Sequence, residues 1–116
     1  MATIASHNEK RGHARVKIVA RVHMRTGGEV QLMRVGDASL TGLFLHGHPL
    51  AFPELQYGAE LDLALFPEGD NQGIAFRGRV IRVDDGRYTS RPGFGVLIVG
   101  IKSADAMRYR QLLDQA

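Results

Sequence analysis

Strand-like alternation begins at VKIVARVHMR (residues 16–25), after a polar N-terminal stretch. A period of two is typical of a β-strand with one buried face. The next residues, Thr26-Gly27-Gly28, predict a hairpin turn into a second strand from Glu29 to Val35. On the first strand, one face would carry Val16, Ile18, Ala20, Val22 and Met24, and the other largely Lys17, Arg21, His23 and Arg25.

The rest of the chain continues as short apolar segments separated by turns. Gly78 lies within one of these segments and predicts a bulge or a close backbone approach. The nearly continuous apolar run from Phe94 to Ile101 predicts a strand that is buried on both faces. The further strands are predicted at residues 43–45, 60–66, 74–83 and 94–101, with a loop over residues 46–58.

A final helix is predicted after these strands. Ser103 would be its N-cap and Asp105 would lie in its first turn, where an acid suits the helix dipole. Ala106, Tyr109 and Leu113 would form its inward stripe. Six antiparallel strands and one packed helix predict a mainly β fold, a small closed or nearly closed barrel with a C-terminal α-helix.

Length and composition indicate one small domain. At 116 residues the chain can bury a modest core, and it has no cysteine for disulfides or thiolate metal sites. Residues 1–9 are polar and predict a flexible arm ahead of a domain over residues 10–114. No apolar run reaches about 18 residues, and residues 1–8 lack the plan of a secretory signal. We therefore expect a cytoplasmic protein without membrane insertion.

Charge divides the chain into three parts. Residues 1–36 carry seven Lys or Arg and two acids, whereas residues 37–76 carry six acids and no Lys or Arg. Residues 77–116 carry eight basic residues and four acids. A basic N-terminal third suits a polyanionic ligand, and the acidic middle argues against a surface evenly coated for duplex DNA.

Two short motifs lie on either side of the first hairpin. Arg11 and Arg15 form an RxxxR pattern, and Asp37, Ser39 and Gly42 form a DxSxxG pattern. The arginine guanidinium binds an oxyanion or a purine edge through two parallel hydrogen bonds, and it stacks on aromatic rings. Asp37 can accept guanine N–H groups, the Ser39 hydroxyl can donate or accept, and in an extended segment both would share a face. Gly42 would allow a positive φ or a close backbone approach to a ligand.

Each motif alone has a simpler explanation. The two arginines also fit a solvated basic tail, and Gly42 fits an ordinary hairpin. Asp37 and Ser39 fit a turn whose side chains bond their own backbone. Both motifs in this order, ahead of several short strands and a final helix, favour a binding site.

With this combination the chain resembles the bacterial PilZ family, over about residues 10–114. The resemblance implies a receptor for cyclic di-GMP. In it the two arginines would clamp phosphate and guanine, Asp37 and Ser39 would read a guanine edge, and Gly42 would end the turn.

The same resemblance implies a mechanism and a stoichiometry question. Lys10 occupies the position that is thought in the family to influence whether one ligand or an intercalated pair is held. The implied mechanism is ordering of the N-terminal RxxxR arm by the ligand. Signalling would then use a separate, unidentified protein partner, and no cofactor is implied.

Other functions are less favoured. No nucleophile has an evident base, so we expect no enzyme activity. His46 and His48 have the spacing of a metal pair but no clear third ligand, so we expect no metal site. An adaptor that works by protein contact alone, for example in pilus assembly or motility, is the main alternative. A small nucleic-acid-binding barrel is less favoured because few aromatic residues accompany its candidate arginines, which are Arg77, Arg79, Arg82, Arg87 and Arg91.

Overall fold

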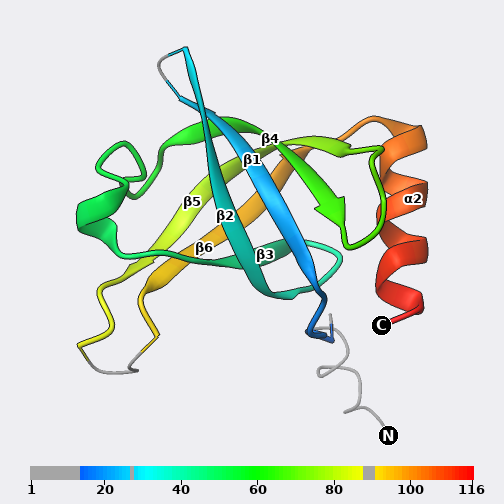
Figure 1. Cartoon of the computed structure of the whole chain (residues 1–116), viewed down its shortest axis with the longest axis horizontal. Helices are drawn as coiled ribbons and strands as arrows, with labels where there is room; N and C mark the ends of the chain where they lie inside the picture. The colour runs from blue at the N-terminus through cyan, green and yellow to red at the C-terminus, as the bar shows by residue number, and fades with distance from the viewer. Residues whose placement is uncertain (1–13, 27, 88–90) are drawn as a thin grey trace, which may run out of the picture.

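The computed structural model describes residues 14–26, 28–87 and 91–116. Within these ranges the chain forms six β-strands, one short 3-10 helix and one α-helix (Figure 1). The strands pair antiparallel and close into a barrel in the order β1-β2-β3-β6-β5-β4, which confirms the predicted mainly β fold. The bounds are β1 (Ala20–Thr26), β2 (Glu29–Ala38), β3 (Gly42–His46), η1 (Pro49–Ala51), β4 (Glu60–Pro67), β5 (Ile74–Asp84), β6 (Gly93–Gly100) and α2 (Ser103–Asp114).

Alternate side chains of the strands fill the barrel and form its core. Val22 and Met24 of β1 are fully buried, as their alternation predicted. A bulge lies beside Gly78, as predicted, because the register between β5 and β6 shifts between Arg77 and Gly78; the extra residue is Val99 of β6. A Cβ on Gly78 would lie 2.5 Å from Cγ1 of Val96 and 2.7 Å from Cδ1 of Leu63, so the missing side chain makes room for the core.

Three sequence-based expectations about the strands are wrong. The first strand begins at Ala20, because Val16 forms only an isolated bridge with Ala38. The second strand continues past Val35 to Ala38. The last strand is not buried on both faces: Val99 is 37% exposed, since this part of the outer surface of the closed barrel meets solvent.

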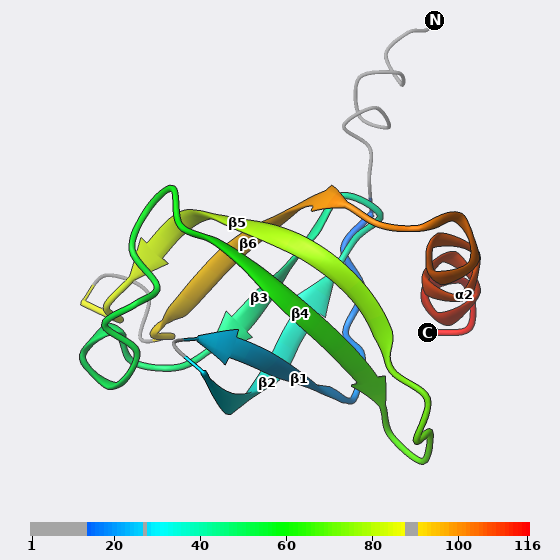
Figure 2. The same ribbon diagram turned by 90° about the horizontal axis from the view of Figure 1, so that it is seen from above.

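The helix α2 packs against the barrel at one edge of the molecule in both ribbon views, and its Tyr109 belongs to the hydrophobic core (Figure 1 and Figure 2). Tyr109 is its buried residue and Ala106 and Leu113 are half-buried, which confirms the predicted inward stripe. The predicted N-cap is wrong, because Ser103 is already helical and Lys102 occupies the cap without a side-chain hydrogen bond. None of the helices in the described ranges is long and apolar enough to cross a membrane.

Hydrogen bonds tie α2 to two loops of the barrel. The Tyr109 hydroxyl donates a 2.6 Å bond to the backbone carbonyl of Ser39, within the DxSxxG motif. Arg108 donates to the carbonyls of Gln72 and Gly73 at 2.7 and 2.9 Å, in the turn before β5. The helix therefore supports the same loop that carries one of the two motifs.

The Tyr109–Ser39 bond predicts a stability effect. Tyr109→Phe should lower the free energy of unfolding by about 1–3 kcal/mol, because the buried Ser39 carbonyl loses its donor while the ring remains in place. Urea unfolding of both proteins at neutral pH measures the difference. A variant as stable as the wild type would contradict this role.

The same bond predicts a pH dependence. Burial raises the pKa of the Tyr109 hydroxyl, so the folded protein keeps a proton that the unfolded chain loses above about pH 10. The stabilisation is therefore complete below that pH and declines as the pH rises. Between pH 8 and pH 11, the stability advantage of the wild type over Tyr109→Phe should shrink by about 1.4 kcal/mol. An unchanged difference in urea unfolding would contradict this expectation.

Candidate functional site

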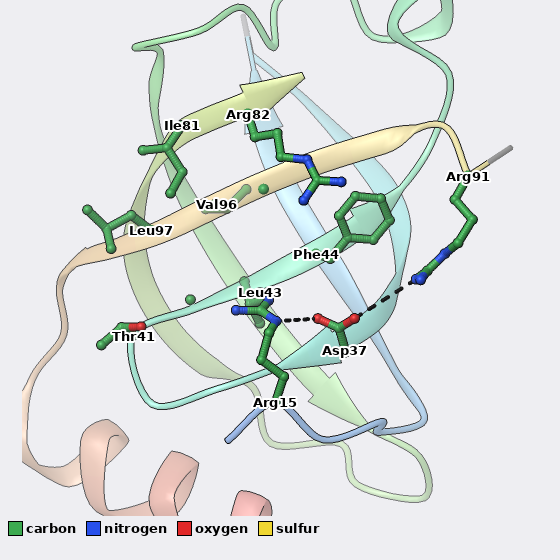
Figure 3. Close-up of a pocket in the computed structure, with 12 residues that line it drawn as sticks. Arg15, Asp37, Thr41, Leu43, Phe44, Ile81, Arg82, Arg91, Val96 and Leu97 are labelled. Carbon is green, nitrogen blue, oxygen red and sulfur yellow. Dashed lines mark hydrogen bonds and ion pairs between the residues drawn. The ribbon is translucent and has the colours of Figure 1, made fainter. Parts of the chain in front are cut away.

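An ion pair joins the two sequence motifs on the surface of the barrel. Nε of Arg15 donates a 2.8 Å hydrogen bond to Oδ1 of Asp37 (Figure 3). Two backbone hydrogen bonds between Val16 and Ala38, at 2.8 and 2.9 Å, bring the segment before β1 against the end of β2. The structure thus brings Arg15 and Asp37 together, as the motifs suggested.

This ion pair lies at the edge of a pocket of about 420 Å³. The floor is the outer face of β3, β6 and β5 (Figure 3). A volume of this size falls within the usual range for small-molecule sites. The charged lining residues are Arg15, Asp37, Arg82 and Arg91, and the apolar ones include Phe44, Ile81 and Leu97.

Two β-bulges aim side chains into the pocket. The register between β2 and β3 shifts at Gly36, and Asp37 faces outward after it. The register between β5 and β6 shifts at Ile81, and both Ile81 and Arg82 are exposed. Bulges often redirect side chains next to binding sites. Here they break the strict alternation of two strands at the points where those strands border the pocket.

One row of paired residues crosses the floor of the pocket. Asp37 of β2 pairs with Phe44 of β3, Phe44 with Gly95 of β6, and Gly95 with Arg82 of β5. The Arg82 side chain extends across β6, and its guanidinium carbon lies 5.6 Å from the Phe44 ring centroid (Figure 3). Arg91, which precedes β6, lies 5.1 Å from the same centroid, and its Nη2 lies 3.9 Å from Oδ2 of Asp37. Asp37 therefore sits between Arg15 and Arg91.

The pocket carries more positive than negative charge. Three guanidinium groups and one carboxylate line it, and Asp84 contacts Arg82 at 3.1 Å beside it. The side chains of Arg15, Arg82 and Arg91 are about half exposed. Exposed ion pairs contribute only about 0–1 kcal/mol, so these arginines can exchange a carboxylate for a ligand anion at little cost. The planar guanidinium suits phosphate oxygens and purine edges.

Ser39 does not reach the pocket with Asp37. Its side chain is buried, at 1% exposure, and its Oγ accepts a 3.3 Å hydrogen bond from the backbone N–H of Thr41. Because β2 ends at Ala38, the extended geometry does not continue to Ser39. The prediction that the two side chains share a face is wrong. For Ser39 the simpler explanation holds, a turn that bonds its own backbone.

Gly42 lines the pocket, and its lack of a side chain lets β3 pack closely against β6. It is not among the positive-φ glycines of the described residues. A Cβ at this position would lie 2.3 Å from the backbone oxygen of Val96, so the close approach in the structure is to β6. The two other predicted site residues, Lys10 and Arg11, lie outside the described residues.

Sequence reasoning missed Phe44 as a pocket residue and considered Arg82 and Arg91 only for nucleic acid. A signal for Phe44 was present, because inward Leu43 and Leu45 leave it facing outward on β3. The arginines gave no such signal. They reach the pocket only because β5 and β6 lie next to β3 in the closed barrel.

Two of the other arginines considered for nucleic acid are paired with acids on β4. Arg79 donates to Oε2 of Glu60 at 2.9 and 2.8 Å, and Arg77 donates to Asp62 at 2.8 Å. Hydrogen bonding from Arg79 lowers the pKa of Glu60, and Asp62 raises the pKa of Arg77. These pairs reduce the positive charge that this part of the surface offers to a nucleic acid.

The two histidines considered for a metal have local roles. The His46 ring lies edge-on to Phe44, with centroids 5.5 Å apart, and burial followed by the nearby Arg91 lowers the pKa of His46. Nδ1 of His48 accepts a 3.2 Å hydrogen bond from the Leu50 N–H and caps η1. The described part of the chain has no group of three or more His, Asp or Glu side chains that could hold a metal ion.

Comparisons with known proteins agree with this architecture. The family model described as PilZ domain matches residues 9–115. The PilZ domain of YcgR from Escherichia coli, solved with c-di-GMP, gives a TM-score of 0.70 at 13% identity, covering 90% of each chain. An uncharacterized Legionella protein gives 0.55 at 14% identity, covering 89% of this chain and 92% of that one.

The Bacillus subtilis inhibitor of motility (MotI/DgrA) gives a TM-score of 0.70 at 17% identity. The alignment covers 92% of this chain and 53% of that protein, so this chain spans about half its length. At these identities the likeness concerns the fold. Comparison with curated proteins gives no significant match.

Proposed function

Because the chain belongs to the PilZ domain family, we propose that it binds cyclic di-GMP in the pocket on the outer face of its barrel. The observation that carries the proposal is the 2.8 Å ion pair between Arg15 and Asp37, which joins both motifs at the edge of a cationic pocket. The YcgR domain of the same fold was solved with this ligand. Cyclic di-GMP offers two phosphates and two guanines, the groups that arginine and aspartate bind well.

Binding would exchange partners within the ion pair. Arg15 would leave Asp37 for a phosphate oxygen or a guanine, and Asp37 would accept N–H groups from a guanine edge. Each charged group then keeps a partner. The exposed pair that is lost contributes only about 0–1 kcal/mol, whereas each new bond to a charged group contributes about 1.5–3 kcal/mol.

Arg11 would supply the second cation of the RxxxR motif. Four residues of extended chain span at most about 14 Å, so Arg11 and Arg15 can hold different parts of one ligand. Fixing the backbone of each residue costs about 1–2 kcal/mol, which keeps the binding reversible. Ordering of this segment would create a new surface for a separate protein partner. Amide exchange in residues 8–15 that stays the same at saturating ligand would contradict the ordering step.

We propose a binding module rather than an enzyme. The hydroxyl of the DxSxxG motif is buried against Thr41 and is not exposed as a nucleophile. Such a binding module would signal by contacting a partner protein through the surface that its ligand creates. The alternative is an adaptor that binds its partner without a nucleotide, which the intact RxxxR and DxSxxG motifs disfavour.

Isothermal titration of cyclic di-GMP into the purified chain tests the proposal. We expect saturable binding, and the stoichiometry will give the number of ligand copies, one or an intercalated pair. A folded protein that gives no binding would overturn the proposal in favour of the nucleotide-independent adaptor.

A further inference from the structure

We infer that Arg82 and Arg91 form a second ligand-binding half of the pocket, which holds the part of the cyclic dinucleotide that Arg15 and Asp37 do not reach. The inference rests on the proposed function and extends it. Neither arginine belongs to either motif. Both line the same pocket as Arg15 and Asp37.

The pocket is wider than the Arg15–Asp37 ion pair can cover. The row from Asp37 through Phe44 and Gly95 to Arg82 crosses three interstrand steps. At about 4.8 Å each, these steps place the backbones of Asp37 and Arg82 about 14 Å apart. No single hydrogen-bonding group spans that width. A ligand that fills the pocket must therefore meet side chains from β5 and from the segment before β6.

The two arginines are held in position by an aromatic ring. Phe44 points outward from β3, yet it is only 6% exposed. The guanidinium carbons of Arg82 and Arg91 lie 5.6 and 5.1 Å from its centroid, within cation–π range. The buried ring is therefore a support rather than a stacking platform for the ligand. The half-exposed guanidinium groups can offer stacking faces and N–H donors to a purine or a phosphate.

Two glycines of β6 make this arrangement fit. A Cβ on Gly93 would lie 2.3 Å from Cζ of Phe44, so only glycine leaves room for the ring. A Cβ on Gly95 would lie 3.1 Å from Cβ of Arg82, where the Arg82 stem crosses the strand. The floor of the pocket is thus shaped for the Phe44 ring and the Arg82 side chain together.

The two arginines have different acidic neighbours, so we expect them to contact different parts of the ligand. Nη2 of Arg91 lies 3.9 Å from Oδ2 of Asp37, so a guanine edge bound to Asp37 would lie within contact distance of Arg91. The Arg82 backbone is at the far end of the row, whereas its guanidinium reaches across β6 toward Phe44 and contacts Asp84 at 3.1 Å. We expect Arg91 to contact the guanine and the nearer phosphate. Arg82 would contact the more distant purine or phosphate.

Calorimetric titration of cyclic di-GMP into Arg82→Ala, Arg91→Ala and the double variant tests the inference. Each single variant should bind at least tenfold more weakly than the wild type, and the double variant more weakly still. Arg87→Ala is the matched control, because Arg87 is an exposed arginine near the same end of β5 that pairs with Asp85 and does not line the pocket. It removes the same charge and should stay within about twofold of the wild type.

The outcomes separate this inference from the proposed function. A folded double variant that binds within threefold of the wild type would overturn the inference and leave the proposed function intact. A wild type that does not bind would overturn both. If Arg91→Ala does not fold, Arg91→Lys keeps the charge but loses the planar fork, and it should bind at least threefold more weakly. An Arg91→Lys variant that binds cyclic di-GMP as tightly as the wild type would count against a contact through the Arg91 guanidinium.

Discussion

Replacing both arginines of the RxxxR motif should weaken cyclic di-GMP binding by more than a hundredfold. Each hydrogen-bonded arginine is expected to contribute at least about 1.5 kcal/mol, which is more than tenfold in affinity. Arg11 and Arg15 would hold different parts of the ligand, so their losses should add in Arg11→Ala/Arg15→Ala. The Arg15 substitution also leaves Asp37 with Arg91 as its remaining cation in the pocket. Calorimetric titration of the wild type and the double variant measures the effect.

The chain contains its own matched control for this experiment. Arg21 and Arg25 have the same spacing on β1, are exposed, and do not line the pocket. Arg21→Ala/Arg25→Ala removes the same charge and should leave the affinity within about twofold. Equal losses in both double variants would mean that general charge attraction, and not a specific site, governs binding.

Replacing Gly42 should strongly destabilise the folded chain. A Cβ there would lie 2.3 Å from the backbone oxygen of Val96 and 3.4 Å from Cα of Leu97. Both are backbone atoms of β6, in the ladder where Gly42 pairs with Leu97, so neither can rotate away. Overpacking costs about 1–3 kcal/mol, and we expect Gly42→Ala to reach the upper end. The melting temperature should fall by roughly 10 °C.

Gly100→Ala on the same strand β6 is the control for this prediction. The nearest atom to its new Cβ is Cβ of Arg77 at 3.8 Å, an ordinary contact, so the melting temperature should change little. Thermal melts of both variants without ligand give the comparison. A Gly42→Ala protein that melts like the wild type would show that this glycine is not required for the β3–β6 contact.

The strand pattern could be predicted from the sequence because burial on one face imposes a period of two. Val22 and Met24 follow it, and Gly78 marks its bulge. The bulges at Gly36 and Ile81 could not be predicted, since each inserts one residue without a change in composition. Sequence likewise did not predict that Val16 only touches Ala38, because alternation alone does not say where pairing starts.

The site was half predictable for a similar reason. Arg15 and Asp37 belong to motifs that lie on either side of one hairpin, so their meeting follows from local chain geometry. Arg82 and Arg91 join them only through the neighbour order β2-β3-β6-β5 of the closed barrel, which is a property of the whole fold. Ser39 was misplaced because the strand ends one residue before it.

The most direct test of a cyclic di-GMP site on this face is a titration followed by two-dimensional amide NMR of the ¹⁵N-labelled chain. We expect saturating ligand to shift the amides of Arg15, residues 37–44, Gly95 and Arg91, together with Arg82 on β5. Amides on the opposite strands, β1 and β4, should change little. An unchanged spectrum, or shifts confined to β1 and β4, would contradict a cyclic di-GMP site on this face.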